Sequence, residues 1–276
     1  MRIKKVLSVL LVLSAVTLTG CDVHFDIGQN SKISKISSKD IKEIDKSFKL
    51  NNVNDLRIAI GRSDVNIVLT DGDEIRVKGK IYDGNDNVIS KQSGSTMTIE
   101  EKDLDYGSWD SEWNFSDKDF SFFRDNNSEI DIEIPKAYKE NIGFKFGAGD
   151  VKINDLEVKK IDFKADAGNV NIDNIIFNDL DIKCGAGNLD INLKKKNGNI
   201  DIKGGVGNTK ITLKEVGGNL KIAGGVGNST IDIPDNSPVD IKAAGGLGNT
   251  NISAKTSGEN KYTFDIKAGV GNISVK

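Results

Sequence analysis

A tetrapeptide that recurs seven times in the C-terminal half of the chain constrains the fold more than any other feature. Each copy reads Gly-x-Gly-Asn or a close variant, and the copies end at Asp150, Asn169, Asn188, Asn208, Asn228, Asn249 and Asn272. Successive copies end 19, 19, 20, 20, 21 and 23 residues apart. A near-constant period in this range is typical of stacked repeats, in which each repeat is one structural unit.

Aliphatic residues fall at fixed distances from the Asp or Asn that closes each copy. Because side chains alternate between the two faces of a strand, positions of one parity are expected to face a common core. The predicted core columns lie eight and six residues before the Asn and three after it, as in Leu180, Ile182 and Ile191. Four and two residues before the Asn, small and large residues vary together, as with Gly204 and Val206. We therefore expect these two columns also to face inward and to share one narrow interior at constant volume.

These patterns predict an all-β, right-handed parallel β-solenoid with coils of about 20 residues and an irregular N-terminal β cap. In each coil one strand leads into the Gly-x-Gly-Asn corner and a second strand leaves it. The Gly before the Asn suits a corner with a positive φ, and the Asn side chains are expected to stack about 4.8 Å apart. A β-meander of hairpins is the alternative, because Gly-Asn also marks tight turns. Twelve consecutive positions align without a gap in all seven copies, which favours the solenoid.

The N-terminus carries the pattern of an export signal. Residues 1–20 combine the basic Arg2, Lys4 and Lys5 with an apolar stretch that is shorter than the ~20 residues a membrane span needs. The sequence Leu-Thr-Gly-Cys that ends at Cys21 resembles the lipobox of bacterial lipoprotein signal peptides. That resemblance implies cleavage before Cys21 and lipidation of its thiol, and hence an extracytoplasmic protein anchored to the cell membrane by lipid. A simple secretory signal with an incidental Cys is the alternative.

The remaining chain divides into three parts. Residues 21–45 are polar and are expected to form a tether between the lipid and the folded domain. Residues 46–140 are expected to hold degenerate β coils and a cap, with a coil whose corner is Asp64 and further strands at 75–81, 95–100 and 129–134. Residues 141–276 carry the regular solenoid repeats.

This arrangement resembles the DUF4097 family, β-strand-repeat proteins that often carry an adhesin label. The resemblance covers roughly residues 50–276 and rests on Leu-Arg-Ile-Ala-Ile, on Ile-Asp-Ile-Glu-Ile-Pro at 130–135, and on runs such as Gly-Asp-Val-Lys-Ile. It implies the fold and no catalytic residues. Some members are linked to cell-envelope stress systems.

Charge and motifs argue for a binding role without chemistry. The formal net charge of −3 becomes −6 once the three basic residues of the signal are removed. A net negative charge is not typical of proteins that bind nucleic acid. The Gly-Gly-Val-Gly-Asn corners partly resemble a calcium-binding nonapeptide, but their period is about twenty residues and not nine. We expect no metal, no cofactor and no enzymatic activity. Cys184 lies in an inward column and is expected to be a packing residue.

The segment 101–128 is the stretch that the repeat does not explain. It holds both Trp residues among seven of the seventeen aromatics, with eight acidic and three basic residues. A cap over the N-terminal end of the core is one interpretation, and a loop that contacts a partner is the other. The candidate partner-binding residues are Tyr106, Trp109, Trp113, Phe115, Phe120, Phe122 and Phe123.

The sequence therefore predicts a lipid-anchored, non-enzymatic binding or scaffold protein of the cell envelope. Its expected partners are the membrane, through Cys21, and an envelope protein or glycan. The alternative is an envelope-stress sensor or regulatory protein that acts through a membrane partner.

Overall fold

A computed structural model describes residues 41–82, 88–101 and 128–276. These residues form 21 strands and no helix. In chain order the strands are β1 (Ile41–Lys49), β2 (Asp55–Arg62), β3 (Asp64–Thr70), β4 (Glu74–Tyr82), β5 (Val88–Ser93), β6 (Thr96–Glu101), β7 (Glu129–Pro135), β8 (Asn141–Ala148), β9 (Val151–Asn154), β10 (Lys160–Ala167), β11 (Val170–Asp173), β12 (Asp179–Ala186), β13 (Leu189–Leu193), β14 (Asn199–Val206), β15 (Thr209–Leu213), β16 (Leu220–Val226), β17 (Ser229–Asp232), β18 (Val239–Leu247), β19 (Thr250–Ile252), β20 (Tyr262–Val270) and β21 (Ile273–Val275).

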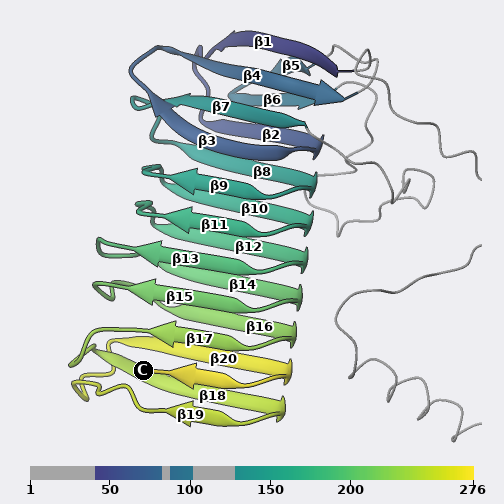
Figure 1. The fold of residues 1–276 in the computed structure, drawn as a ribbon. Helices are drawn as coiled ribbons and strands as arrows, with labels where there is room; N and C mark the ends of the chain where they lie inside the picture. The colour runs from purple at the N-terminus through teal and green to yellow at the C-terminus, as the bar shows by residue number, and fades with distance from the viewer. Residues whose placement is uncertain (1–40, 83–87, 102–127) are drawn as a thin grey trace, which may run out of the picture. The chain divides into compact units, whose positions relative to one another are not determined.

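The strands form two sheets, and each coil of the chain contributes one strand to each sheet (Figure 1). The strands that lead into the corners, such as β8, β10 and β12, pair in parallel in one sheet. The strands that leave the corners, such as β9, β11 and β13, pair in parallel in the other sheet. Parallel neighbours need a crossover and cannot be joined by a tight hairpin. The parallel solenoid is therefore confirmed for these coils, and the meander is excluded.

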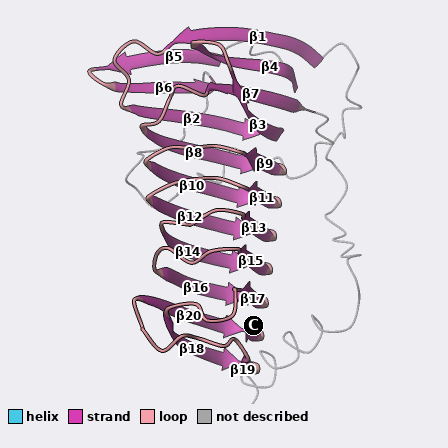
Figure 2. Ribbon diagram, turned by 90° about the vertical axis from the view of Figure 1, so that its left-hand side faces the viewer, coloured by secondary structure: helices cyan, strands magenta, loops and turns pink. Residues whose placement is uncertain are grey.

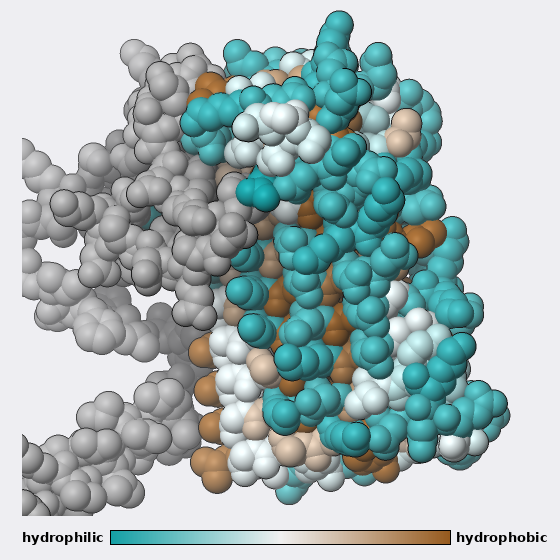
Figure 3. All heavy atoms as spheres, turned by 180° about the vertical axis from the view of Figure 1, so that it is seen from behind, coloured by the Kyte–Doolittle hydropathy of each residue, from teal (hydrophilic) through white to brown (hydrophobic). Residues whose placement is uncertain are grey.

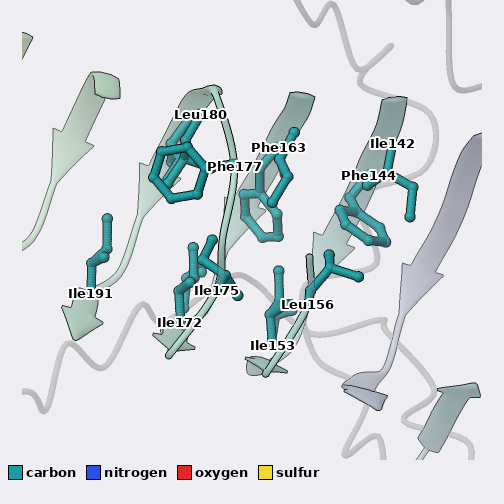
Figure 4. Close-up of a cluster of buried hydrophobic side chains, with 14 of the residues drawn as sticks. Ile142, Phe144, Ile153, Leu156, Phe163, Ile172, Ile175, Phe177, Leu180 and Ile191 are labelled. Atoms are coloured by element: carbon teal, nitrogen blue, oxygen red, sulfur yellow. The ribbon is translucent and has the colours of Figure 1, made fainter. Parts of the chain in front are cut away.

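The core lies between the two sheets, where the predicted aliphatic columns meet (Figure 4). Phe144 and Phe163 come from neighbouring coils of one sheet, with ring centroids 6.3 Å apart. Ile153 and Ile172 face them from the other sheet and are buried. The return turns add Leu156 and the buried residues Ile175 and Phe177, which the corner-based alignment did not identify as core. Each such side chain contributes about 1.5–3 kcal/mol by burial.

The coils do not stack in chain order at the C-terminal end. Strands β20 and β21, the last in the chain, lie between β16/β17 and β18/β19 in both sheets. Figure 1 shows β20 between β16 and β18. The terminal coil in space is therefore residues 239–252. Its Ile252 is 45% exposed, so the prediction that the column three residues after the Asn is buried in every coil is wrong at this position.

A similar exchange occurs at the other end of the stack. The coil β2/β3 lies between β6/β7 and β8/β9, although β6 and β7 follow it in the chain. Its corner residue Asp64 accepts a hydrogen bond from the backbone N–H of Asp150. The coil predicted around Asp64 thus packs as a regular member of the stack. Antiparallel strands then close this end, with β1 on β4 and β5 on β6. Strand β1 begins at Ile41, ahead of the expected start of the β pattern at residue 46.

The corners have the backbone geometry that the tetrapeptide predicts. The Gly before the Asp or Asn has a φ between 123° and 146° in all seven copies, in the region that favours glycine. In every coil but the terminal one, whose corner is Asn249, the corner Oδ1 accepts a hydrogen bond from the backbone N–H of the corresponding residue in the next coil, as from Asn188 to Asn169 and from Asn208 to Asn188. This ladder runs through Asp64, Asp150, Asn169, Asn188, Asn208, Asn228, Asn272 and Asn249 in spatial order.

The inward placement predicted for the column two residues before the Asn is wrong. Its members are exposed, from Ala186 to Val206 and Leu247. The ladder pairs Ala165 with Cys184 and Ala167 with Ala186 but omits the residue between them, which marks a bend in the strand. Side-chain alternation does not continue through this bend, so the column turns outward.

The small residues four positions before the Asn face the residue just after the Asn. A Cβ added to Gly245 would lie 3.2 Å from the Thr250 hydroxyl oxygen, and one added to Gly224 would lie 3.9 Å from that of Ser229. Two of the three glycines in this column, Gly224 and Gly245, therefore stand opposite hydroxyl-bearing residues across the core. The exposed Val and Leu have no part in that packing.

Candidate binding surface at the coil corners

Four aliphatic side chains form a continuous exposed row along the corners, which we call the corner ridge. It consists of Val206, Val226, Val270 and Leu247, which are 59%, 49%, 44% and 72% exposed. Parallel pairing places each of them beside the next in that order. Figure 3 shows apolar side chains in a column at this edge. Ala186, Ala167 and Ala148 continue the row toward the N-terminal coils with smaller side chains.

The corner ridge holds four of the five large hydrophobic side chains that are exposed in the described part of the chain. The fifth, Ile252, belongs to the terminal coil. Single exposed aliphatic residues are ordinary on protein surfaces, but a contiguous row of them marks a site of interaction. The sequence signal that could have identified it is the glycine on either side of each Val or Leu, because a Gly-x-Gly bend interrupts strand alternation.

The segment 101–128 leaves the stack at the same edge. Strand β6 runs parallel to β2 and ends beside its corner, where the Glu101 carboxylate accepts a hydrogen bond from the backbone N–H of Gly61 at 3.2 Å. The chain returns at Ser128, whose carbonyl oxygen accepts from the N–H of Asp64 at 2.9 Å. Both stems are thus fixed to one corner of the stack. The aromatic candidates Tyr106, Trp109, Trp113, Phe115, Phe120, Phe122 and Phe123 lie outside the described residues, as does Cys21.

The outer face of the sheet that contains β10 carries columns of like charge, with Asp162, Asp181 and Asp201 in one column and Lys164, Lys183 and Lys203 in another. Lys160 bridges two of the carboxylates, at 3.2 Å from Asp162 and 3.0 Å from Asp181. Further along, Lys221 lies next to Asp201 in the register and forms an ion pair with it at 3.4 Å, which interrupts the acidic column. A shallow groove of about 630 Å³ lies over this face, where Gly143 has no side chain. Its carboxylates form ion pairs, Asp55 with Arg57, Asp162 and Asp181 with Lys160, and Asp201 with Lys221, which is typical of a solvated sheet surface.

Two carboxyl groups on this sheet have altered acidity. Burial raises the pKa of Asp162, although the charge of Lys160 acts in the opposite direction. Burial also raises the pKa of Asp166 to about 6. Asp166 occupies the first position of its tetrapeptide, where the other six copies have Gly. It therefore introduces a half-buried acid into a corner that is otherwise built from glycine.

Cys184 packs against the core as a partly buried free thiol. Burial raises the pKa of this thiol to about 12, so the reactive thiolate is scarce at neutral pH. The inward packing role expected for Cys184 is consistent with this environment.

The corner oxygen atoms are used by the backbone. Because each Oδ1 in the ladder accepts an N–H from the next coil, these atoms are poor candidates for metal ligands. In the part of the chain that the structure describes, no group of three or more His, Cys, Asp or Glu side chains converges as a metal site would require. Among the described residues, no helix is long and apolar enough to cross a membrane.

Comparison with solved structures gave matches at low sequence identity. A crystal structure of a "putative cell adhesion protein" from Clostridium sporogenes is 21% identical, covers 86% of this chain and 99% of its own, and gives a TM-score of 0.42. One of a "putative adhesin" from Bacteroides fragilis is 15% identical, covers 85% of this chain and 97% of its own, with a TM-score of 0.42. A third, from Parabacteroides merdae, is 12% identical, covers 85% of this chain and 96% of its own, and gives a TM-score of 0.27.

A comparison with curated protein sequences gave no match. The family model described as Toastrack DUF4097 matches residues 53–276, which include every regular coil and the coil around Asp64. The match ends with the last residue of the chain and begins just before β2. The chain therefore belongs to the Toastrack DUF4097 family.

Proposed function

We propose that this chain is a lipid-anchored, extracytoplasmic binding or scaffold protein of the cell envelope, without enzymatic activity, and that it binds its partner along the corner edge. The observation that carries the proposal is the corner ridge, a row that holds four of the five large exposed hydrophobic side chains of the described residues. The lipid anchor and the location rest on the lipobox that ends at Cys21.

An envelope protein is the class of partner that best suits the ridge. Aliphatic side chains in a row provide apolar area for burial against another apolar surface, worth about 25 cal/mol per Å². The glycines between them keep the surface flat at the backbone, as with Gly207 and Gly227 beside Val206 and Val226. The rigid stack holds these side chains at fixed spacing, so little conformational entropy is lost when the surface is covered.

Photo-crosslinking in intact cells tests the proposal. A photoreactive residue at Val226 is expected to give a discrete protein adduct, and the same residue at Lys214, which is exposed after the end of β15 that is remote from the corner, is expected to give none. Substituting Val206→Lys and Val270→Lys should then abolish the adduct at position 226 while the thermal midpoint stays within a few degrees. Equal adducts at both positions, or an adduct that survives the two substitutions, would remove the ridge as the binding surface.

The identity of the adduct distinguishes the scaffold role from the sensor or regulatory role. An adduct with a membrane protein supports the sensor or regulatory role, and one with a soluble or surface protein supports the scaffold role. An adduct with a glycan would identify the partner as a glycan and not a protein. The aromatic residues of the 101–128 segment stay a predicted part of the contact. Trp109→Ala with Trp113→Ala should reduce the same adduct and leave stability unchanged, whereas a large fall in the thermal midpoint would identify that segment as a cap.

A further inference from the structure

The two ends of the stack are finished differently (Figure 2). At one end the antiparallel strands β1 and β5 form the sheet edges, and exposed charges such as Glu43, Asp45 and Lys46 lie along β1. Charged side chains on an edge strand prevent another strand from pairing with it. At the other end the edges are β18 and β19. The two charges of β18, Asp240 and Lys242, form an ion pair with each other, and Ala243, Ala244, Gly245 and Gly246 beside them form an uncharged run. The first end is therefore protected against pairing, and the second is open to it.

The free edge of β18 points its backbone groups away from the stack. The N–H of Tyr262 in β20 donates to the carbonyl oxygen of Pro238, and the two strands are parallel. In a parallel ladder alternate residues direct their N–H and C=O to opposite sides. Asp240 and Lys242 thus bond to β20, while Ile241 and Ala243 present their N–H and C=O at the open edge.

The free edge of β19 is arranged in the same way. The carbonyl oxygen of Asn249 accepts from the N–H of Ile273, and the N–H of Ser253 donates to Val275, so these residues face β21. Because alternate residues of β19 face opposite sides, Ile252 directs its N–H and C=O away from β21, toward the open edge. Because Gly245 faces Thr250 across the core, the residues two positions further from the corner, Ala243 and Ile252, face each other in turn.

We infer that this open end binds the open end of a second copy of the chain. A two-fold axis that passes by Ala243 and Ile252 would place β18 antiparallel to its own counterpart and β19 antiparallel to its own. Both central residues direct their backbone groups outward, so each would exchange two hydrogen bonds with its counterpart. Two sheets would be extended at once, and the exposed end of the core would be covered.

The side chains of β18 are complementary in this register. Ile241 stands opposite Gly245 of the second copy, while Ala243 meets its own counterpart, and the pairing ends there because the strand bends at Gly246. A large residue therefore meets a small one beside the central pair. The charged residues of β18 do not meet like charges, because Lys242 lies opposite Ala244 and Asp240 lies beyond the paired stretch. Like charges directly opposite would destabilise such a pairing.

A second copy suits this end better than a single strand of another protein. The open end offers two strand edges with the half-buried Ile241 and Ala243 between them and the exposed Ile252 on the facing strand. One added strand would pair with a single edge and leave the apolar interior in water. Another open end supplies both edges and the apolar surface together. The contact is also isologous, so it closes as a dimer and cannot extend into a filament.

Cysteine crosslinking tests the geometry. The two Cα atoms of residue 243 are expected about 5.5 Å apart in the dimer, within the range that a disulfide can bridge. The test uses the full chain with Cys21→Ser and Cys184→Ala, which removes the two native thiols. Under mild oxidation Ala243→Cys should form a covalent dimer, and Ala223→Cys, exposed on the outer face of β16, should not. Equal crosslinking at the two positions would overturn the proposal.

Sedimentation of the same chain gives an independent readout. Ile252→Lys should raise the dimer dissociation constant at least tenfold. The matched control Val206→Lys makes the same type of change on the corner ridge and should leave the constant within about twofold. A chain that stays monomeric at about 100 µM, or a dimer lost with Val206→Lys and kept with Ile252→Lys, would contradict the inference. The ridge crosslinks can fail while this dimer forms, so the two proposals stand or fall separately.

Discussion

The corner glycines differ in how much space an added Cβ would have, and this difference predicts different effects of substitution. Gly207 has a φ of 144°, and a Cβ there would overlap the carbonyl oxygen of Gly187. Gly204 has no atom within 4 Å of an added Cβ. Gly207→Ala should therefore destabilise the fold by more than the ~1–3 kcal/mol of the backbone strain alone. Gly204→Ala should be neutral or stabilising by about 0.4–1 kcal/mol, because it restricts the unfolded chain. Urea unfolding of both variants checks the contrast, and equal effects would contradict it.

Asp166 should make stability depend on pH. Its folded pKa of about 6 lies above the ordinary value of 3.8, so ionisation of this carboxyl lowers the free energy of unfolding. The penalty is complete above about pH 6, fades as the pH falls through that value, and is absent below 3.8. Asp166→Asn should thus raise the thermal midpoint at pH 8 and change it little near pH 3.8. Asp166→Gly restores the residue of the other six copies and should show the same trend. A gain that persists or grows in acid would exclude burial as the cause.

The corner ladder links each coil to the next through one side-chain oxygen. Asn208 accepts from the N–H of Asn228, whereas Asn249 ends the ladder among the described residues. Asn208→Ala should cost about 0.5–1.5 kcal/mol, since the freed N–H remains near water. Asn249→Ala should cost less, because its oxygen has no ladder partner to lose. Hydrogen exchange at the Asn228 amide provides the local measurement, and unchanged protection there after Asn208→Ala would show that the bond is unimportant.

The repeat predicted where the strands lie in the sequence but not the order in which the coils stack in space. The positions of Ile182 and Ile191 follow from side-chain alternation and the fixed period, because both depend only on local geometry. The outward turn of Val206 could not be derived from alternation, since the bend at the flanking glycines changes the parity. The exchange of the last two coils leaves no trace in an alignment, because any coil offers the same backbone edges to any other. The stems at Glu101 and Ser128 likewise follow from pairing between distant strands. The predicted right-handed sense of the coils stays a prediction.

The attachment of the protein to the membrane is expected to depend on one thiol, that of Cys21. If Cys21 carries the lipid, Cys21→Ser should move the protein from the membrane fraction to the soluble fraction of cells, because one apolar segment of residues 6–18 is too short to span. Cys184→Ser, at the partly buried position in the stack, serves as the matched control and should leave the fractionation unchanged. Membrane retention of Cys21→Ser with an intact, unmodified N-terminus would refute the anchor.

The position of β20 and β21 inside the stack sets a rule for biosynthesis. Residues 239–252 leave the ribosome before residues 262–275, yet they rest on them in the finished protein. The two strands of the earlier segment consequently have no neighbouring coil to pair with until residues 262–275 have been made. A chain cut short by a few residues loses both the missing strand and the support of a strand that is fully present. Residues 239–252 can therefore take their place in the stack only after residues 262–275 have been synthesised and have folded onto the preceding coil.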